Sequence, residues 1–231
     1  MTVGYELTDS VATITLDDGK VNVLGPAMQT AINEALDRAE KDSAKAVVIA
    51  GNGRVFSGGF DLSVFSSGDA KAAHWMLAGG FELSVRCMTF PVPVIMAATG
   101  PAIAMGSFLL LSGDHRVGQP KTRCQAIEVA IGMTIPNAAL EIMRFRLTPA
   151  AFHRGASMAA TFAGDEAITG GWLDEIVDPD RVVARAQEVA AEAASTLHTG
   201  AHKATKLKAR ESALRAIRAG IDGLATEFSL G

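Results

Sequence analysis

The sequence has few of the residues that hold metal ions or covalent cross-links. Only Cys87 and Cys124 are cysteines among 231 residues, and they form no C-x-x-C pair. The five histidines never stand in H-E-x-x-H spacing, and the pair His198 and His202, four residues apart, falls on an expected surface helix, where a metal site is the less favoured reading. We therefore expect no structural zinc, no disulfide framework and no cofactor, and this cysteine usage fits a cytoplasmic location.

Positive charge is also scarce. The net charge is −4 with both signs interspersed, which argues against nucleic acid and against an anionic membrane surface as partners. Residues 1–20 carry acids and alternating apolar residues rather than a basic flank and an apolar run, so we expect no signal peptide.

One long segment has no charge at all. Residues 87–113 could cross a bilayer on length alone, but Pro91, Pro93 and Pro101 interrupt it where a spanning helix needs continuity. We interpret it as buried core: a strand over 92–99, a turn, and a short helix over 103–113.

Nucleotide and hydrolase signatures are missing too. The run "GNGRVF" (51–56) ends in Phe56 where a dinucleotide fingerprint needs glycine. No G-K-[ST] and no G-x-S-x-G occurs, so neither a Walker loop nor a nucleophile elbow is supported.

What the chain does have is a strand and helix rhythm. With 48% hydrophobic residues it can build one large core. The patterns predict a hairpin over 5–18, a helix over 26–42, a buried strand over 44–51, a helix over 70–90, and helices from Thr148 onward. This order predicts an α/β fold with a core over 1–180 and a C-terminal helical region over 181–231.

Two glycine-containing junctions follow buried strands: "FSGGFDL" (56–62) and "TGPAIAMG" (99–106). If the two strands are neighbours in one parallel sheet, both junctions leave at the same edge, where α/β sheets bind ligands. Unpaired N–H groups of the two turns could then converge on one point and form an oxyanion hole. From the spacings alone, two turns that only pack are an equally good interpretation.

Three stretches together resemble a known family. "RVFSGGFDL" (54–62), "PAIAMGSFLLLSGDHRV" (101–117) and "QAIEVAIGMTIP" (125–136) resemble the crotonase (enoyl-CoA hydratase/isomerase) superfamily, in particular its short actinobacterial probable enoyl-CoA hydratases. The resemblance runs through nearly the whole chain. It implies a β-β-α superhelix with a C-terminal trimerisation region, an acyl-CoA thioester as substrate, and a homotrimer or dimer of trimers.

The resemblance also implies site residues. The thioester oxygen is expected to accept hydrogen bonds from the backbone amides of Phe60 and Met105, and Glu128 is the expected catalytic acid/base. The stretch "AMG" (104–106) stands where the family often has three glycines, which puts the acyl-chain shape in question. The remaining expected substrate and CoA contacts are Ser57, Gly59, Phe60, Asp61, Leu62, Ser63, Gly106 and Phe108.

A second acid is missing. Hydratases of the family hold a water between two glutamates, and the position of the first is Phe108 here, while Glu128 keeps the second. A single carboxylate facing a dienolate resembles the family's Δ3,Δ2-enoyl-CoA isomerases, so we favour isomerisation over hydration. Another crotonase chemistry, such as decarboxylation or thioester hydrolysis, and a non-catalytic acyl-CoA binder remain as alternatives.

Several other residues have a structural interpretation as well as a functional one. Glu128 itself could be an exposed strand-edge residue. Asp114 and Arg116 are assigned to a structural ion pair or cap, and Glu141 is the weaker candidate for a second acid. Two groups also have a double reading: Trp75, Met76 and Phe81 as acyl-tail contacts or helix core, and Lys203, Lys206 and Lys208 as a CoA-phosphate contact of a neighbouring subunit or a solvated cluster.

Overall fold

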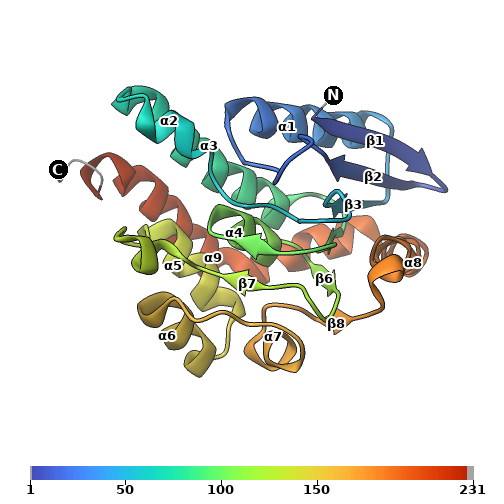
Figure 1. Cartoon of the computed structure of the whole chain (residues 1–231). Helices are drawn as coiled ribbons and strands as arrows, with labels where there is room; N and C mark the ends of the chain where they lie inside the picture. The colour runs from blue at the N-terminus through green and yellow to red at the C-terminus, as the bar shows by residue number, and fades with distance from the viewer. Residues whose placement is uncertain (1, 228–231) are drawn as a thin grey trace.

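The computed structural model describes residues 2–227 and places a largely parallel sheet at the centre of the molecule (Figure 1). The strands are β1 (Val3–Thr8), β2 (Val11–Leu16), β3 (Ala46–Ala50), β4 (Val94–Ala97), β5 (Ala102–Ile103), β6 (His115–Gly118), β7 (Cys124–Gln125) and β8 (Glu175–Ile176). The helices are α1 (Pro26–Lys41), α2 (Leu62–Ser66), α3 (Ala70–Thr89), α4 (Met105–Leu111), α5 (Asn137–Arg146), α6 (Pro149–Met158), α7 (Asp165–Gly170), α8 (Val182–Thr196) and α9 (Thr199–Glu227). Two short 3-10 helices cover Glu128–Ile131 and Pro179–Arg181.

The main sheet has the strand order β1-β2-β3-β4-β6-β8. Only β1 and β2 are antiparallel, and β2, β3, β4, β6 and β8 run parallel to their neighbours. The first pair is the predicted hairpin, turning at Asp9 and Ser10, which both have positive φ. A separate pair, β5 with β7, lies beyond the carboxyl end of β4.

Helices cover both faces of the sheet, which explains the unbroken apolar run of β3. Val47 and Ile49 point into the larger core, with α1, α3 and α4. Ala46, Val48 and Ala50 point to the other face, where Val182, Ala186 and Ala190 of α8 cover them. Figure 1 shows α8 on one side of the strands and the remaining long helices on the other. The predicted α/β class and the strand–helix–strand order are confirmed.

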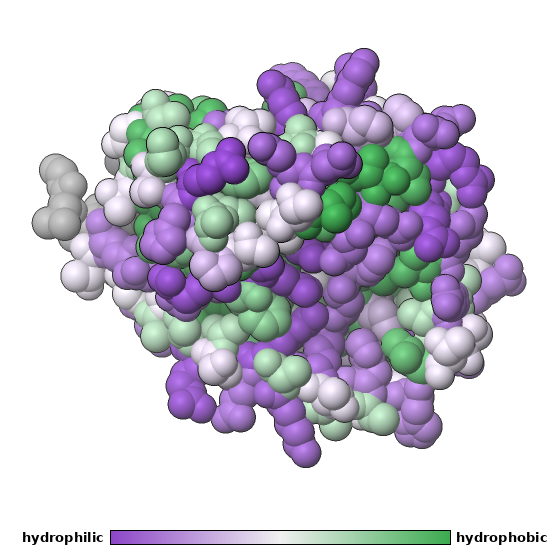
Figure 2. All heavy atoms as spheres, turned by 90° about the horizontal axis from the view of Figure 1, so that it is seen from below, coloured by the Kyte–Doolittle hydropathy of each residue, from purple (hydrophilic) through white to green (hydrophobic). Residues whose placement is uncertain are grey.

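The predicted helix over 103–113 begins later than expected, at Met105. Ala102 N–H donates to Arg123 O (2.8 Å) and Ala104 N–H to Gln125 O (2.9 Å), so the chain runs as a short strand beside β7 first. The uncharged segment is buried as predicted, and none of the helices within residues 2–227 has the length and hydropathy to span a bilayer. Figure 2 shows one face of the molecule largely covered by hydrophilic side chains, with apolar ones in separate groups.

Buried ion pairs hold the C-terminal helix to the sheet. Asp114, directly before β6, accepts from Val94 N–H (2.8 Å) and pairs with Lys206 Nζ and Arg210 Nη2 of α9, both at 2.6 Å. Arg116 pairs with Asp174 at 2.7 Å. Asp114 and Arg116 thus belong to structural ion pairs, as predicted, but with separate partners.

The lysine cluster is only partly solvated. Lys203 and Lys208 are exposed, whereas Lys206 is buried against Asp114, so the solvated reading is wrong for that residue. Helix α8 packs on β2, β3, β4 and β6 of its own chain, and α9 packs on α3 and α5. The proposed boundary between 1–180 and 181–231 stays a prediction.

The Asp114 pairs generate a stability prediction. Asp114→Ala leaves Lys206 and Arg210 as buried cations without a carboxylate, so we expect the free energy of unfolding in urea to fall by about 3–5 kcal/mol. The control is Glu211→Ala, which removes the exposed partner of Arg215 on the same helix and should cost less than about 1 kcal/mol. Equal losses in the two variants would contradict the role given to the buried cluster.

Candidate functional site

Three loops meet at the carboxyl edge of the parallel sheet, because β2, β3 and β4 are adjacent and end on the same side. The loop after β3 joins the loop after β2 through Gly58 N–H to Val21 O (2.8 Å) and Leu24 N–H to Gly59 O (2.7 Å). It joins the segment after β4 through Ile103 N–H to Ser57 O (3.0 Å). The predicted meeting of the two glycine junctions is confirmed.

The two junctions approach most closely at Gly59. Its φ is +97°, and a Cβ built there would lie 2.9 Å from the Ala104 Cβ, 3.0 Å from the Ile103 carbonyl oxygen and 3.4 Å from the Met105 nitrogen. Ala104 has a positive φ of 50°, which turns the chain into α4. Only glycine allows this approach at position 59.

Two amides beside this contact have no acceptor. Met105 is the first residue of α4, so its N–H has no partner inside the helix. Within residues 2–227 neither the Phe60 nor the Met105 N–H donates to a backbone or side-chain oxygen. These are the two amides expected to bind a thioester oxygen, and that role stays a prediction.

A buried asparagine fixes the loop after β2. Asn22, fully buried and with a φ of 53°, donates its side-chain amide to Leu16 O (3.0 Å) and Phe56 O (3.2 Å). Ser57 Oγ donates to Asn22 O at 2.7 Å and accepts from Gly59 N–H at 3.2 Å. The side chain of Ser57 therefore braces the turn.

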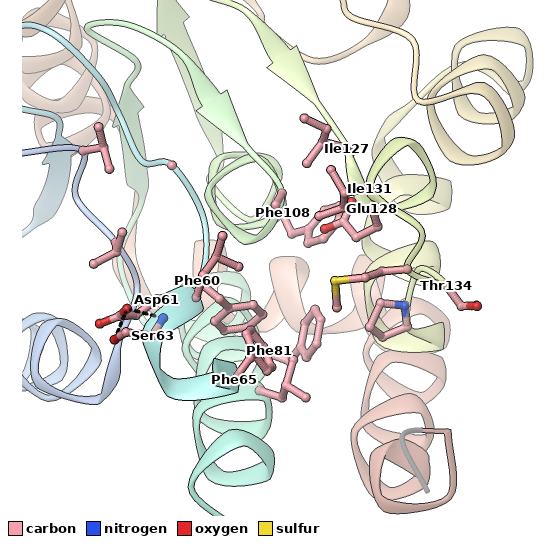
Figure 3. Close-up of a pocket in the computed structure, with 18 residues that line it drawn as sticks. Phe60, Asp61, Ser63, Phe65, Phe81, Phe108, Ile127, Glu128, Ile131 and Thr134 are labelled. Atoms are coloured by element: carbon pink, nitrogen blue, oxygen red, sulfur yellow. Dashed lines mark hydrogen bonds between the residues drawn. The ribbon is translucent and has the colours of Figure 1, made fainter. Parts of the chain in front are cut away.

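A cavity of about 370 Å³ opens in front of these loops (Figure 3). It extends from the loop after β2, past α2 and α3, to the segment 127–136. Its lining is mostly apolar: Val21, Val23, Gly58, Phe60, Asp61, Leu62, Ser63, Phe65, Leu77, Phe81, Ala104, Phe108, Ile127, Glu128, Ile131, Met133, Thr134 and Pro136.

Aromatic rings form one wall of this cavity. Phe60 meets Phe65 and Phe81 edge-on, with centroids 6.2 and 6.1 Å apart, and Phe81 stacks with Phe108 at 6.4 Å. Phe108 is 1% exposed and belongs to α4, two residues after Gly106. Figure 3 shows Phe108 and Glu128 projecting toward the same end of the cavity.

Glu128 is the first residue of a 3-10 helix and is only 8% exposed. Its Oε2 has no hydrogen-bond partner within the described residues. Burial raises the pKa of its carboxyl to about 7, while a hydrogen bond from its own backbone amide acts in the opposite direction. The interpretation of Glu128 as an exposed strand-edge residue is wrong.

The other acids nearby are engaged or absent from the cavity. Asp61 lines it, but caps α2 by accepting from the Ser63 amide (3.0 Å) and hydroxyl (2.6 Å). Glu141 pairs with Arg144 at 3.2 Å on α5 and is not among the lining residues, so it is not a second acid of this site. Glu128 is thus the lining carboxylate that keeps a buried oxygen, Oε2, without a partner in the part of the chain that is described.

The expected site residues fall into two sets. Phe60, Asp61, Leu62, Ser63, Phe108 and Glu128 line the cavity, and Leu62 lies at its mouth with 62% of its surface exposed. Ser57, Gly59, Met105 and Gly106 pack behind it, and a Cβ on Gly106 would lie 2.4 Å from Ser57 O. Of the residues with a double reading, Phe81 lines the cavity, Met76 is helix core, and Trp75 is 67% exposed elsewhere on α3.

Sequence reasoning missed two parts of the wall. Val21 and Val23 follow β2, and their position was predictable once β2 was taken as parallel to β3. Met133, Thr134 and Pro136 lie in the stretch "QAIEVAIGMTIP" that carries the resemblance, but no local pattern in it shows that these side chains face the cavity. Within residues 2–227 no group of three or more His, Cys, Asp or Glu is placed to hold a metal ion.

Known proteins resemble this chain in sequence and in overall structure. A family model described as enoyl-CoA hydratase/isomerase matches residues 6–228. The crystal structure of the probable enoyl-CoA hydratase EchA3 of Mycobacterium tuberculosis H37Rv is 57% identical, covers 100% of this chain and 97% of that one, and has a TM-score of 0.98. An apo structure of the same M. tuberculosis protein, described there as an enoyl-CoA isomerase, is 56% identical over 98% of this chain and 99% of that one, with a TM-score of 0.95.

Curated relatives match over a shorter stretch. A putative enoyl-CoA hydratase of Thermus thermophilus is 32% identical over 139 residues, which is 58% of this chain and 55% of that protein. The chain spans about half the length of the first curated relatives it matches.

The buried carboxyl generates a prediction about stability and pH. Between pH 4.5 and 7 the folded state holds a proton on Glu128 that the unfolded chain has lost, so the free energy of unfolding falls as the pH rises through this window. Gln does not titrate. Relative to wild type, Glu128→Gln should therefore gain up to about 3 kcal/mol between pH 4 and pH 8 in urea unfolding.

The matched control is Glu141→Gln, which alters a half-buried acid outside the cavity. Its stability difference from wild type should change by less than about 1 kcal/mol over the same range. A Glu128→Gln difference that stays flat with pH would show that burial does not hold the proton on this carboxyl.

Proposed function

The chain belongs to the enoyl-CoA hydratase/isomerase family, and we propose that within it this protein moves a double bond, converting a 3-enoyl-CoA to a 2-enoyl-CoA. The observation that carries the proposal is the buried carboxyl of Glu128, whose Oε2 has no partner within residues 2–227, in an apolar cavity that Phe108 also lines. The amides of Phe60 and Met105 supply the hydrogen-bond donors for the thioester oxygen.

The first step is removal of a proton from C2. The Glu128 carboxylate takes this proton, the C2–H electron pair forms a C1–C2 double bond, and the carbonyl pair moves onto the thioester oxygen. The resulting dienolate oxygen accepts hydrogen bonds from the Phe60 and Met105 amides. In a dry apolar site such donors lower the barrier by several kcal/mol.

The second step returns the same proton at C4. The oxygen pair reforms the carbonyl, the C1–C2 pair becomes the C2–C3 double bond, and the former C3–C4 pair takes the proton from Glu128. One carboxyl serves both steps because it is a base in the first and an acid in the second. A pKa of about 7 leaves both forms populated near neutral pH.

Hydration requires groups that orient a water molecule, and this cavity offers few of them. Water must be oriented for attack at C3 while a proton reaches C2, and in the family two glutamates do this. Here a buried phenyl ring stands in place of the first glutamate. A phenyl ring neither accepts nor donates a strong hydrogen bond, so only Glu128 is left to hold the water.

Enoyl-CoA hydratase activity is the second candidate, because several similar proteins carry that name. The two descriptions meet in one relative, since M. tuberculosis EchA3 is described as a probable hydratase with one structure and as an isomerase with another. A protein that binds acyl-CoA without turnover is the third. The remaining expectations belong to the same proposal: the CoA portion lies along Asp61, Leu62 and Ser63, no cofactor is used, and the protein is a cytoplasmic homotrimer or dimer of trimers.

The proposal predicts a ranking of two rates. Purified protein should convert 3-hexenoyl-CoA to 2-hexenoyl-CoA with a higher kcat/KM than it hydrates crotonyl-CoA, both followed by the absorbance of the conjugated thioester. The kcat/KM for isomerisation should rise as the pH passes through about 7, because the carboxylate form of Glu128 is the base. Glu128→Gln should lower it about 10²–10⁴-fold.

Glu141→Gln is the control and should keep wild-type rates. Faster hydration than isomerisation in the wild type would reverse the ranking of the first two functions. Binding of the thioester with no change in its absorbance would favour the non-catalytic binder, and full turnover by Glu128→Gln would remove this residue from the mechanism.

A second prediction concerns the close approach of the two turns. Gly59→Ala adds a methyl group 2.9 Å from the Ala104 Cβ, which must push apart the turns that carry the Phe60 and Met105 amides. We expect kcat/KM for isomerisation to fall at least about 10²-fold, the order of effect seen when one oxyanion donor is lost.

Gly53→Ala is the control that separates the effect of backbone strain from the effect of pushing the two turns apart. Gly53 also has a positive φ, +85°, but nothing lies within 4 Å of a Cβ there. Both variants should lose about 1–2 kcal/mol of stability from the backbone conformation. Only Gly59→Ala should lose activity, and equal activities in the two would show that the turns need not touch.

A further inference from the structure

A second cavity, of about 610 Å³, has Asp114 in its lining. Its walls are the start of α9, the connection from α8 and Phe145 of α5. It shares no lining residue with the acyl cavity described above. The proposed isomerase mechanism makes no use of it.

The α9 wall carries basic and imidazole side chains at a regular spacing. His198, His202, Lys206 and Arg210 follow one another at intervals of four, and all of them line the cavity. His202 N–H donates to His198 O at 2.9 Å, so the helical spacing extends back to His198. Residues four apart on a helix lie on one face, so these side chains form a single stripe.

Positive charge exceeds negative charge around this cavity. Lys206 and Arg210 are 6% and 7% exposed, and both pair with the same carboxylate, Asp114. Arg146, next to the lining residue Phe145, donates to the carbonyls of Leu111 and Gly113 and has no carboxylate partner in the described part of the chain. Burial, together with Arg116 and Arg210, lowers the pKa of Arg146 to about 9.

Hydrogen-bond donors along the stripe remain unused. Lys206 Nζ carries three N–H groups, and one is directed at Asp114 Oδ2, which also accepts from Val94 N–H. His202 Nε2 is buried and has no partner within residues 2–227. A buried polar atom without a partner costs about 1–3 kcal/mol, and an acceptor in the cavity would remove that cost.

We infer that this second cavity binds a small oxyanion, a phosphate or a carboxylate, held by Lys206 Nζ and His202 Nε2 and balanced by the charge of Arg210. An oxyanion supplies acceptors to both donors at once and neutralises the excess of buried positive charge. Asp114 cannot do this alone, because its two oxygens already serve Lys206, Arg210 and Val94.

The pKa of the His202 imidazole reports directly on anion binding. Burial, Lys206 and Arg210 lower the pKa of His202, and Asp114 acts against them. The other titratable or charged groups that line the cavity are His198, Asp114, Lys206 and Arg210. A bound oxyanion favours the protonated imidazole, so the pKa of His202 should rise when the site fills.

The test uses inorganic phosphate, sulfate and acetate with the full-length protein, against sodium chloride at equal ionic strength. Thermal unfolding should show a rise in Tm of about 3–5 °C when the bound anion is at ten times its Kd. The NMR titration of the His202 ring should shift to higher pH under the same conditions. Phosphate and sulfate acting without acetate would identify a tetrahedral oxyanion, and acetate acting alone would identify a carboxylate.

Three variants define the site. Lys206→Met and His202→Phe should lose the anion-dependent rise in Tm, whereas Lys208→Met, which alters an exposed lysine on the same helix, should keep it. His202→Phe leaves the Asp114 ion pairs intact, so it tests the site even where Lys206→Met does not fold. Equal Tm values in all anions and chloride, or a rise that survives in His202→Phe, would overturn the assignment.

This outcome is independent of the proposed reaction. His202→Phe lies outside the acyl cavity, so the rate of enoyl-CoA turnover should not change. Failure of the isomerase proposal would leave the anion-dependent stability as it is, and failure of the anion site would leave the ranking of isomerisation and hydration as it is.

Discussion

The contact between the turn after β3 and the turn after β4 is the constraint on which the site depends. Gly59 sits so close to Ala104 and Ile103 that no side chain fits between them. This contact places the turn that leads to Phe60 beside Met105, the first residue of α4, and requires left-handed backbone at residues 59 and 104. The parallel pairing of β3 with β4 makes it possible, because both turns then leave the sheet on the same side.

Burial acts on both the chemistry and the stability of the molecule. Burial of Glu128 among the apolar residues of the cavity raises the pKa of its carboxyl to about 7. A carboxyl with this pKa can both accept and return a proton near neutrality, but its ionised form is poorly solvated in the folded state. The molecule therefore keeps a locally unfavourable group where the reaction would need it, and the surrounding sheet and helices supply the stability.

The sequence allowed the prediction of the local elements and of the residues near the reaction centre, for identifiable reasons. The hairpin, α1, α3 and the two glycine junctions follow from periodicity, Pro26 and glycine placement. Glu128 was reached through resemblance, because nothing in "QAIEVAIG" alone shows that its carboxyl is buried. Partners distant in the chain were not predictable: Asp114 with Lys206 and Arg210, and Val21 with Gly58, depend on tertiary packing that no local pattern encodes.

The ion pairs of Asp114 with Lys206 and Arg210 have a consequence for the order in which the chain is synthesised and folds. The cavity at the sheet edge is lined by residues between 21 and 136, yet Asp114, directly before β6, is held by side chains at 206 and 210. Synthesis runs from the N-terminus, so the ribosome completes the whole lining before it adds the residues that secure it. Until residues 182–196 follow, the sheet face that α8 covers is also open to water. The nascent chain thus passes through a stage with its cavity lining complete and its hydrophobic surface uncovered, when a chaperone would find most to bind.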